Sequence, residues 1–121
     1  MGHHSQQHPI LNLLERLVPT RPKSMFGGTG IYSDDIFFAI LDGNRLYFKV
    51  DDQNRPDYQA CGMSWFNPYG TATNISSFYE VPPSVLAEPL LLRKWALDAI
   101  EAARRARRTR KGPASRRVDF N

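Results

Sequence analysis

The sequence predicts an α+β fold: an antiparallel β-sheet meander flanked by an N-terminal helix, a short middle helix and a long C-terminal helix. Two strand patterns, at residues 36–41 and 45–50, are separated by Asp-Gly-Asn, which is a strong hairpin signal. A long helical pattern follows Pro89 and continues to about residue 106. The 121 residues suffice for one domain with one hydrophobic core.

The first predicted element is a short helix. Pro9 suits its first turn, because the missing N–H of proline would have no helical partner there. Apolar residues then recur at helical spacing until Pro19 ends the helix. Residues 23–32 read as one extended segment, and together with strands 36–41 and 45–50 they predict an antiparallel meander.

The second half of the chain predicts two helices and two more strands. A short helix over residues 52–61 is capped by Asp52 and ends at Gly62. Residues 65–69 predict a partly buried strand, and residues 75–81 predict another that ends at two prolines. The last helix begins at Glu88-Pro89. Its apolar stripe contains Leu92, Trp95, Ala96, Ala99, Ala103 and Ala106, with Leu91 and Ile100 beside it.

Charge is distributed unevenly along the chain, whose formal net charge is +4. Residues 1–103 contain eight Lys or Arg and eleven Asp or Glu, whereas residues 104–121 contain eight Lys or Arg and one Asp. We therefore predict a disordered leader or tag remnant at residues 1–8, a domain at 9–108 and a basic disordered tail at 109–121. The leader contains His3, His4 and His8 without partner ligands, so we expect no metal site there.

Three glycines, Gly27, Gly28 and Gly30, raise the question of a phosphate-binding loop. Their spacing differs from that of dinucleotide-binding loops, and a strand rather than a helix N-terminus follows them. Glycine within a strand is typical of a bulge, a bend or the close approach of another backbone. We therefore predict structural roles for these glycines and no cofactor.

Five blocks, MFGGTGIY, FFAIL, LYFKVDD, YEVP and KWALDAIEAA, resemble in their order and spacing the N-terminal domain of the TfoX/Sxy family. The resemblance covers about residues 10–106. It implies a small α+β domain, often paired as a dimer, and a link to the regulation of bacterial natural competence. The full-length regulator acts beside the cyclic-AMP receptor protein and has a second, C-terminal domain. This chain leaves room only for a basic tail after its long helix, so we expect a stand-alone copy.

Few residues are suited to catalysis, and we expect no enzyme. All histidines lie in the leader, so none is fixed beside a nucleophile. Cys61 is expected to be a half-buried structural thiol. Three carboxylates, those of Asp51, Asp52 and Asp57, are expected to have capping and turn roles rather than to bind a metal. Lys49 could form exposed ion pairs with Asp51 and Asp52, which would contribute little stability.

Aromatic residues predict a surface for a protein partner or a second copy. Neighbours such as Phe37 and Phe38, or Phe78 and Tyr79, point to opposite faces of a strand. If helices cover one face of the sheet, we expect an outward aromatic patch on the other. The residues concerned are Phe37, Phe38, Tyr47, Phe48, Trp65, Phe66, Phe78 and Tyr79.

The basic end of the chain allows two interpretations. A cluster of cations can supply a nonspecific, salt-sensitive grip on DNA or RNA. Alternatively, it is a solvated helix end with a tail that aids solubility. The cations are Arg104, Arg105, Arg107, Arg108, Arg110 and Lys111.

We therefore predict a cytoplasmic, non-enzymatic TfoX-like regulatory or interaction domain, a transcription or competence co-regulator. Its expected partners are a protein such as the transcription machinery, or a second copy, and no membrane. The alternative is a nonspecific nucleic-acid-binding protein that uses the basic tail. A third class, a small-molecule-binding or enzymatic domain, would need a deep pocket lined by Tyr32, Lys49 and Tyr79 near the glycines.

Overall fold

A computed structural model describes residues 8–25, 28–66 and 75–111, except the side chains of 75, 76, 110 and 111. It confirms the α+β fold class: helices flank a six-stranded antiparallel sheet with strand order β1-β2-β3-β4-β6-β5. The elements are α1 Pro9–Leu17, β1 Arg21–Met25, β2 Gly28–Ser33, β3 Ile36–Asp42, β4 Arg45–Lys49, α2 Arg55–Ala60, β5 Trp65–Phe66, β6 Ile75–Glu80, α3 Pro83–Leu86 and α4 Pro89–Lys111.

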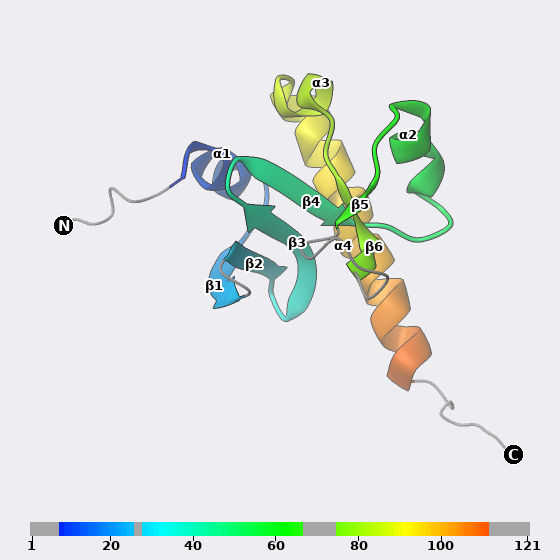
Figure 1. Ribbon diagram of the computed structural model, residues 1–121. Coiled ribbons are helices and arrows are strands. Elements are labelled where there is room, and N and C mark those ends of the chain that lie inside the picture. The colour runs from blue at the N-terminus through cyan, green and yellow to red at the C-terminus, as the bar shows by residue number, and fades with distance from the viewer. Residues whose placement is uncertain (1–7, 26–27, 67–74, 112–121) are drawn as a thin grey trace, which may run out of the picture.

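The helices lie on one face of the sheet and enclose the main hydrophobic core. Figure 1 shows α4 crossing behind the strands, with its C-terminal turns extending beyond the sheet. The core joins Leu14 of α1 and Phe48 of β4 to Leu92 and Ala96 of α4, and all four are buried. None of the described helices is long and apolar enough to cross a bilayer.

α1 begins and ends as its prolines predict. The Ile10 N–H donates to Nδ1 of His8 over 3.0 Å, and Pro9 follows in the first turn. His8 lies in the predicted leader, yet it is the N-cap of this helix and its Nε2 lies 3.0 Å from Oδ1 of Asn44 in the β3–β4 turn. The ordered domain therefore includes His8.

The described residues of the predicted segment 23–32 are extended, as predicted, but they belong to two strands rather than one. β1 and β2 pair antiparallel, with Met25 opposite Gly28. Gly28 faces the neighbouring strand so closely that a Cβ atom would lie 2.8 Å from the Leu41 carbonyl oxygen, while a Cβ on Gly30 would meet the Met25 side chain. Close approach of another backbone therefore requires glycine at position 28. Gly27 lies outside the described residues.

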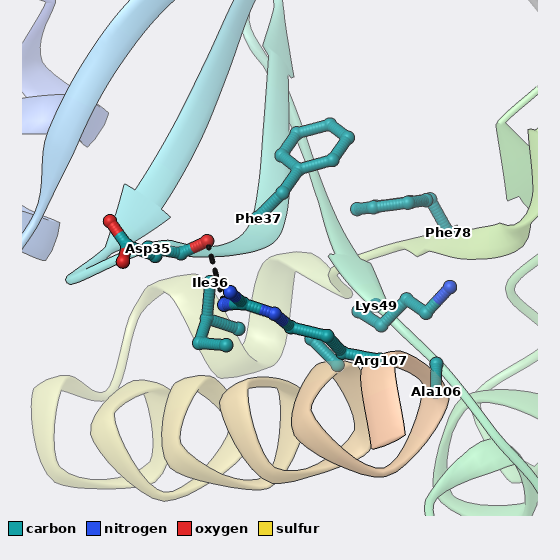
Figure 2. A pocket seen from close by; sticks show the side chains of 8 residues that line it. Asp35, Ile36, Phe37, Lys49, Phe78, Ala106 and Arg107 are labelled. Carbon is teal, nitrogen blue, oxygen red and sulfur yellow. Dashed lines mark hydrogen bonds between the residues drawn. The ribbon is translucent and has the colours of Figure 1, made fainter. Parts of the chain in front are cut away.

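A register shift in β3 decides which aromatic rings enter the core. Ile31 of β2 pairs with Ala39, but the next β2 residue, Tyr32, pairs with Phe37, so Phe38 is an extra residue. Phe38 and Ala39 consequently both belong to the main core. Phe37 lies on the opposite face beside Phe78 (Figure 2). The prediction that Phe37 and Phe38 point to opposite faces is confirmed.

The middle of the chain differs from the predictions in two details. Asn54, not Asp52, is the N-cap of α2, although Gly62 follows the helix with a φ of +74° as a helix-ending glycine does. α3 is an addition to the predicted elements: Pro82-Pro83 predicts the end of a strand, but proline also suits the first turn of a helix. Part of the predicted strand at 65–69, including Tyr69, lies outside the described residues.

Candidate interaction surface

The long helix α4 has a buried stripe and an outer face. Leu92, Ala96 and Ala99 belong to the stripe, are fully buried, and confirm the predicted apolar side. Leu90 and Leu97, seven positions apart and therefore nearly aligned, point away from the core, with 83% and 38% of their surfaces exposed. These two leucines were missed, although their spacing on the side opposite the stripe is readable from the sequence.

Charged side chains surround the two leucines. Lys94, one turn from each of them, pairs with Asp98 over 3.0 Å. Glu101 pairs with Arg104 over 3.4 Å. Exposed pairs of this kind add little stability, so their main effect is to form a polar border. We call this surface the outer face of α4; it consists of Leu90, Lys94, Leu97, Glu101, Arg104 and Arg108.

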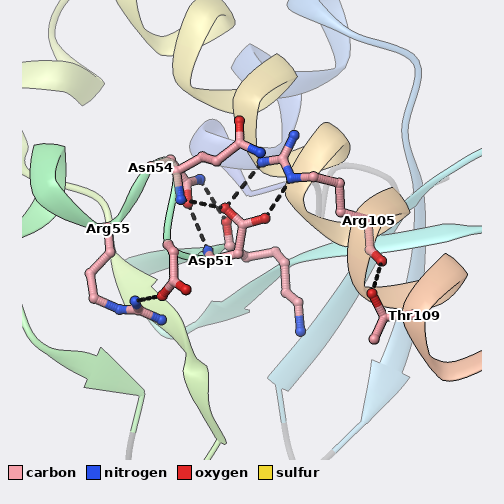
Figure 3. A network of polar contacts seen from close by, with 8 residues as sticks. Asp51, Asn54, Arg55, Arg105 and Thr109 are labelled. Carbon is pink, nitrogen blue, oxygen red and sulfur yellow. Dashed lines mark hydrogen bonds and ion pairs between the residues drawn. The ribbon is translucent and has the colours of Figure 1, made fainter.

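Arg105 does not belong to the outer face, because it binds Asp51 (Figure 3). Its Nε donates to Oδ2 of Asp51 over 2.6 Å and its NH2 group donates to Oδ1 over 3.0 Å. This hydrogen bonding holds the pKa of Asp51 below its ordinary value and raises the pKa of Arg105. The pair joins the second half of α4 to the loop that follows β4.

The same loop is closed by further hydrogen bonds. The side-chain oxygen of Asn54 accepts from the Asp51 N–H over 2.8 Å, and its nitrogen donates to the Lys49 carbonyl over 3.1 Å. Oδ1 of Asp51 accepts from the Gln53 N–H over 3.0 Å. Asp52 pairs with Arg55 (Figure 3). In the described ranges, no three His, Cys, Asp or Glu residues are grouped to hold a metal ion.

The predicted cationic cluster is divided between two sides of α4. Arg108 is exposed and the Arg104 side chain is 41% exposed, whereas Arg107 reaches back to the body, with NH1 donating to the Asp35 carbonyl over 3.5 Å. Of the four arginines of the cluster whose side chains are described, Arg105 and Arg107 therefore bind groups elsewhere in the domain. The side chains of Arg110 and Lys111 lie outside the described residues.

Two sequence-based expectations about exposure are wrong. Cys61 is exposed rather than half-buried, because it follows the last turn of α2 at the surface. The aromatic rings on the second face of the sheet pack against one another and are buried, including Tyr47, Phe66 and Phe78. Among the aromatic residues that the structure describes, Trp65 is the exposed one, at 46%. The other large apolar side chains exposed in the described ranges are Leu90, Leu91 and Leu97 of α4.

Comparisons with known proteins agree with the resemblance seen in the sequence. A family model described as the TfoX N-terminal domain matches residues 12–103. The DNA transformation protein TfoX1 of Aliivibrio fischeri is 24% identical over 110 residues, which are 90% of this chain and 53% of that relative. The chain therefore spans about half the length of this curated relative.

Proposed function

Because this chain belongs to the TfoX N-terminal domain family, we propose that it is a non-enzymatic regulatory domain of bacterial competence that acts through protein contact. The relative named a DNA transformation protein supports the link to competence. The observation that carries the mechanism is the outer face of α4, where Leu90 and Leu97 are exposed on one line of the helix.

The outer face of α4 has the composition of a helix-binding or groove-binding surface. Leucines two turns apart are the spacing at which a helix inserts side chains into a partner helix or groove. The surrounding ion pairs Lys94–Asp98 and Glu101–Arg104 provide the polar rim that such contacts have. The partner is a protein of the transcription machinery or a second copy of this chain. The mass of a cross-linked adduct distinguishes these two partners.

Photo-cross-linking from Lys94, which lies between the two leucines, tests this surface. We expect a benzoylphenylalanine at position 94, introduced in the native bacterium, to give one discrete adduct that survives nuclease treatment. The same probe at exposed Gln59 on α2 is the control and should give none. An adduct of twice the chain's mass would identify a homodimer.

Replacing Leu90 and Leu97 by serine should abolish the adduct while changing the free energy of unfolding by less than about 1 kcal/mol, because neither side chain belongs to a buried core cluster. Absence of any adduct from position 94, or an equally strong adduct in the double variant, would contradict the proposal. Urea unfolding of both proteins provides the check that the fold is unchanged.

A second candidate function is nonspecific nucleic-acid binding by the basic end of α4. It is supported by the exposed Arg108 and the partly exposed Arg104 on the turns that extend beyond the sheet (Figure 1). Removal of all residues from 104 onward would be a poor test, because it would also remove the Arg105 partner of Asp51. A truncation after Thr109 keeps that pair.

If the tail grips phosphates, truncation after Thr109 should weaken duplex-DNA binding at low salt and flatten its dependence on salt. The truncation removes Arg110, Lys111, Arg116 and Arg117. If each cation contacts one phosphate, the slope of log affinity against log salt should fall by about 3–4. A full-length protein with these four residues changed to glutamine is the matched control for chain length. Equal affinity and slope in all three proteins would exclude the tail as a DNA-binding element.

A further inference from the structure

A cleft of about 250 Å³ opens between β3, β4, β6 and α4 (Figure 2). The register between β3 and β4 runs from Asp42–Arg45 to Ala39–Phe48, and the extra residue in β3 lies just before Ala39. The paired register of β3 and β4 ends there, whereas the other edge of β4 continues to pair with β6 as far as Lys49–Phe78. The start of β3 and the end of β4 therefore diverge, and the cleft lies between them.

One wall of the cleft is aromatic, and α4 leaves room beside it. The rings of Phe37 and Phe78 have their centres 5.0 Å apart, and Tyr32 stacks behind Phe37 at 5.1 Å. α4 contributes Ala103 and Ala106, whose side chains are too short to fill the space. Phe37 is half-buried, so part of its ring faces the opening.

Two cations reach the cleft from different elements. Lys49 of β4 donates from Nζ to Oγ of Ser77 over 3.0 Å and lies 5.3 Å from the centre of the Phe78 ring. Arg107 of α4 is held by the Asp35 carbonyl, which is a neutral acceptor and does not neutralise its charge. In Figure 2 the Asp35 carboxylate points to the side away from Phe37 and Lys49. The cleft therefore combines a flat apolar wall with local positive charge.

We infer that this cleft binds a small organic anion, in which a carboxylate or phosphate is attached to one or two flat aromatic rings. The anion lies between Lys49 and Arg107, whose several N–H donors suit carboxylate and phosphate oxygens. The ring lies against Phe37. A volume of about 250 Å³ suits a ligand of this size and is small for a dinucleotide. This site differs from the pocket that the third class would need near the glycines, since it contains Lys49 but is not lined by Tyr32 or Tyr79. The inference does not depend on the proposed protein contact.

Titration of the full chain with 1-naphthoate, followed by amide chemical shifts in NMR, tests the site. We expect saturable shifts centred on Phe37, Lys49 and Phe78. 1-Naphthyl phosphate carries the same ring on a phosphate, so whichever of the two binds more tightly identifies the preferred anion. The neutral 1-naphthalenemethanol should bind at least about tenfold more weakly, because it lacks the charge.

Matched variants separate the cleft from general positive charge. Arg107→Gln should weaken 1-naphthoate binding about tenfold to a hundredfold, because it removes a charged donor. Arg108→Gln, which removes the same charge from the neighbouring outward position, should leave it within about twofold. Ala106→Leu keeps both cations but fills the cleft, and should abolish binding.

Three results would overturn the inference: no saturable shift with either anion at millimolar concentration, equal losses in Arg107→Gln and Arg108→Gln, or unchanged affinity in Ala106→Leu. Unfolding of each variant in urea identifies any that has lost the fold. Arg107 and Ala106 are both only half-buried, so these two changes leave the main core intact.

Discussion

Replacing Phe38 by alanine is expected to reduce the free energy of unfolding by about 3–5 kcal/mol, the largest loss among the changes considered for this domain. The Phe38 side chain has no exposed surface and lies in the core between the sheet and the helices, with its ring centre 5.9 Å from that of Phe48. Its removal would leave a cavity in the middle of the molecule. Since small domains have only about 5–15 kcal/mol in total, the variant should be close to unfolding.

Phe37→Ala is the matched comparison, because it deletes the same atoms one position earlier. Phe37 is half-buried on the opposite face, at the mouth of the cleft, where surrounding solvent can fill the space. We expect its loss to be less than half that of Phe38→Ala when both are measured by urea unfolding with circular dichroism. Equal losses would mean that the register shift in β3 does not separate the two rings as described.

Elements with a strong local pattern were predictable from the sequence. The β3–β4 hairpin has apolar residues and a turn signal whose Gly43 adopts a φ of +62°, and α1 and α4 begin at proline. β1 was harder, because Arg21 to Ser24 are exposed and show no alternation, so their strand is defined by backbone pairing with β2 at the edge of the sheet. Pairing of that kind depends on the neighbour and leaves no pattern in the strand itself.

Predicting the site was limited by contacts between distant parts of the chain. Arg104, Arg105, Arg107 and Arg108 are alike in sequence, yet Arg105 is paired with Asp51, which lies 54 positions earlier. Helical spacing separates Arg104 and Arg108 from Arg107, but it cannot identify the partner of Arg105, because the position of Asp51 depends on how α4 crosses the sheet. The same holds for the cleft, whose residues come from β3, β4, β6 and α4. The outer leucines differ in this respect, since helical spacing places them opposite the buried stripe.

Asp51→Asn is expected to lower the free energy of unfolding by about 1–2 kcal/mol at neutral pH. The amide keeps an oxygen that can accept from the Gln53 N–H, so the turn survives, but the charge that binds Arg105 is lost. Asp52→Asn is the matched control. Asp52 also pairs with an arginine, but its side chain is 97% exposed, so its removal should change stability by no more than a few tenths of a kcal/mol.

The pH dependence of this difference distinguishes the loss of an ion pair from a general weakening of the loop. The pKa of Asp51 is lowered in the folded protein by its hydrogen bonds with Arg105, so the folded state binds the proton less readily than the unfolded chain does. The stabilisation is therefore complete above the ordinary aspartate pKa of about 4 and is lost as the pH falls through the lowered folded value. Urea unfolding of wild type and Asp51→Asn should accordingly differ at pH 7 and converge in acid. A gap that stayed constant from neutral pH to the acid limit would show that Asp51 acts through the shape of the loop and not through its charge on Arg105.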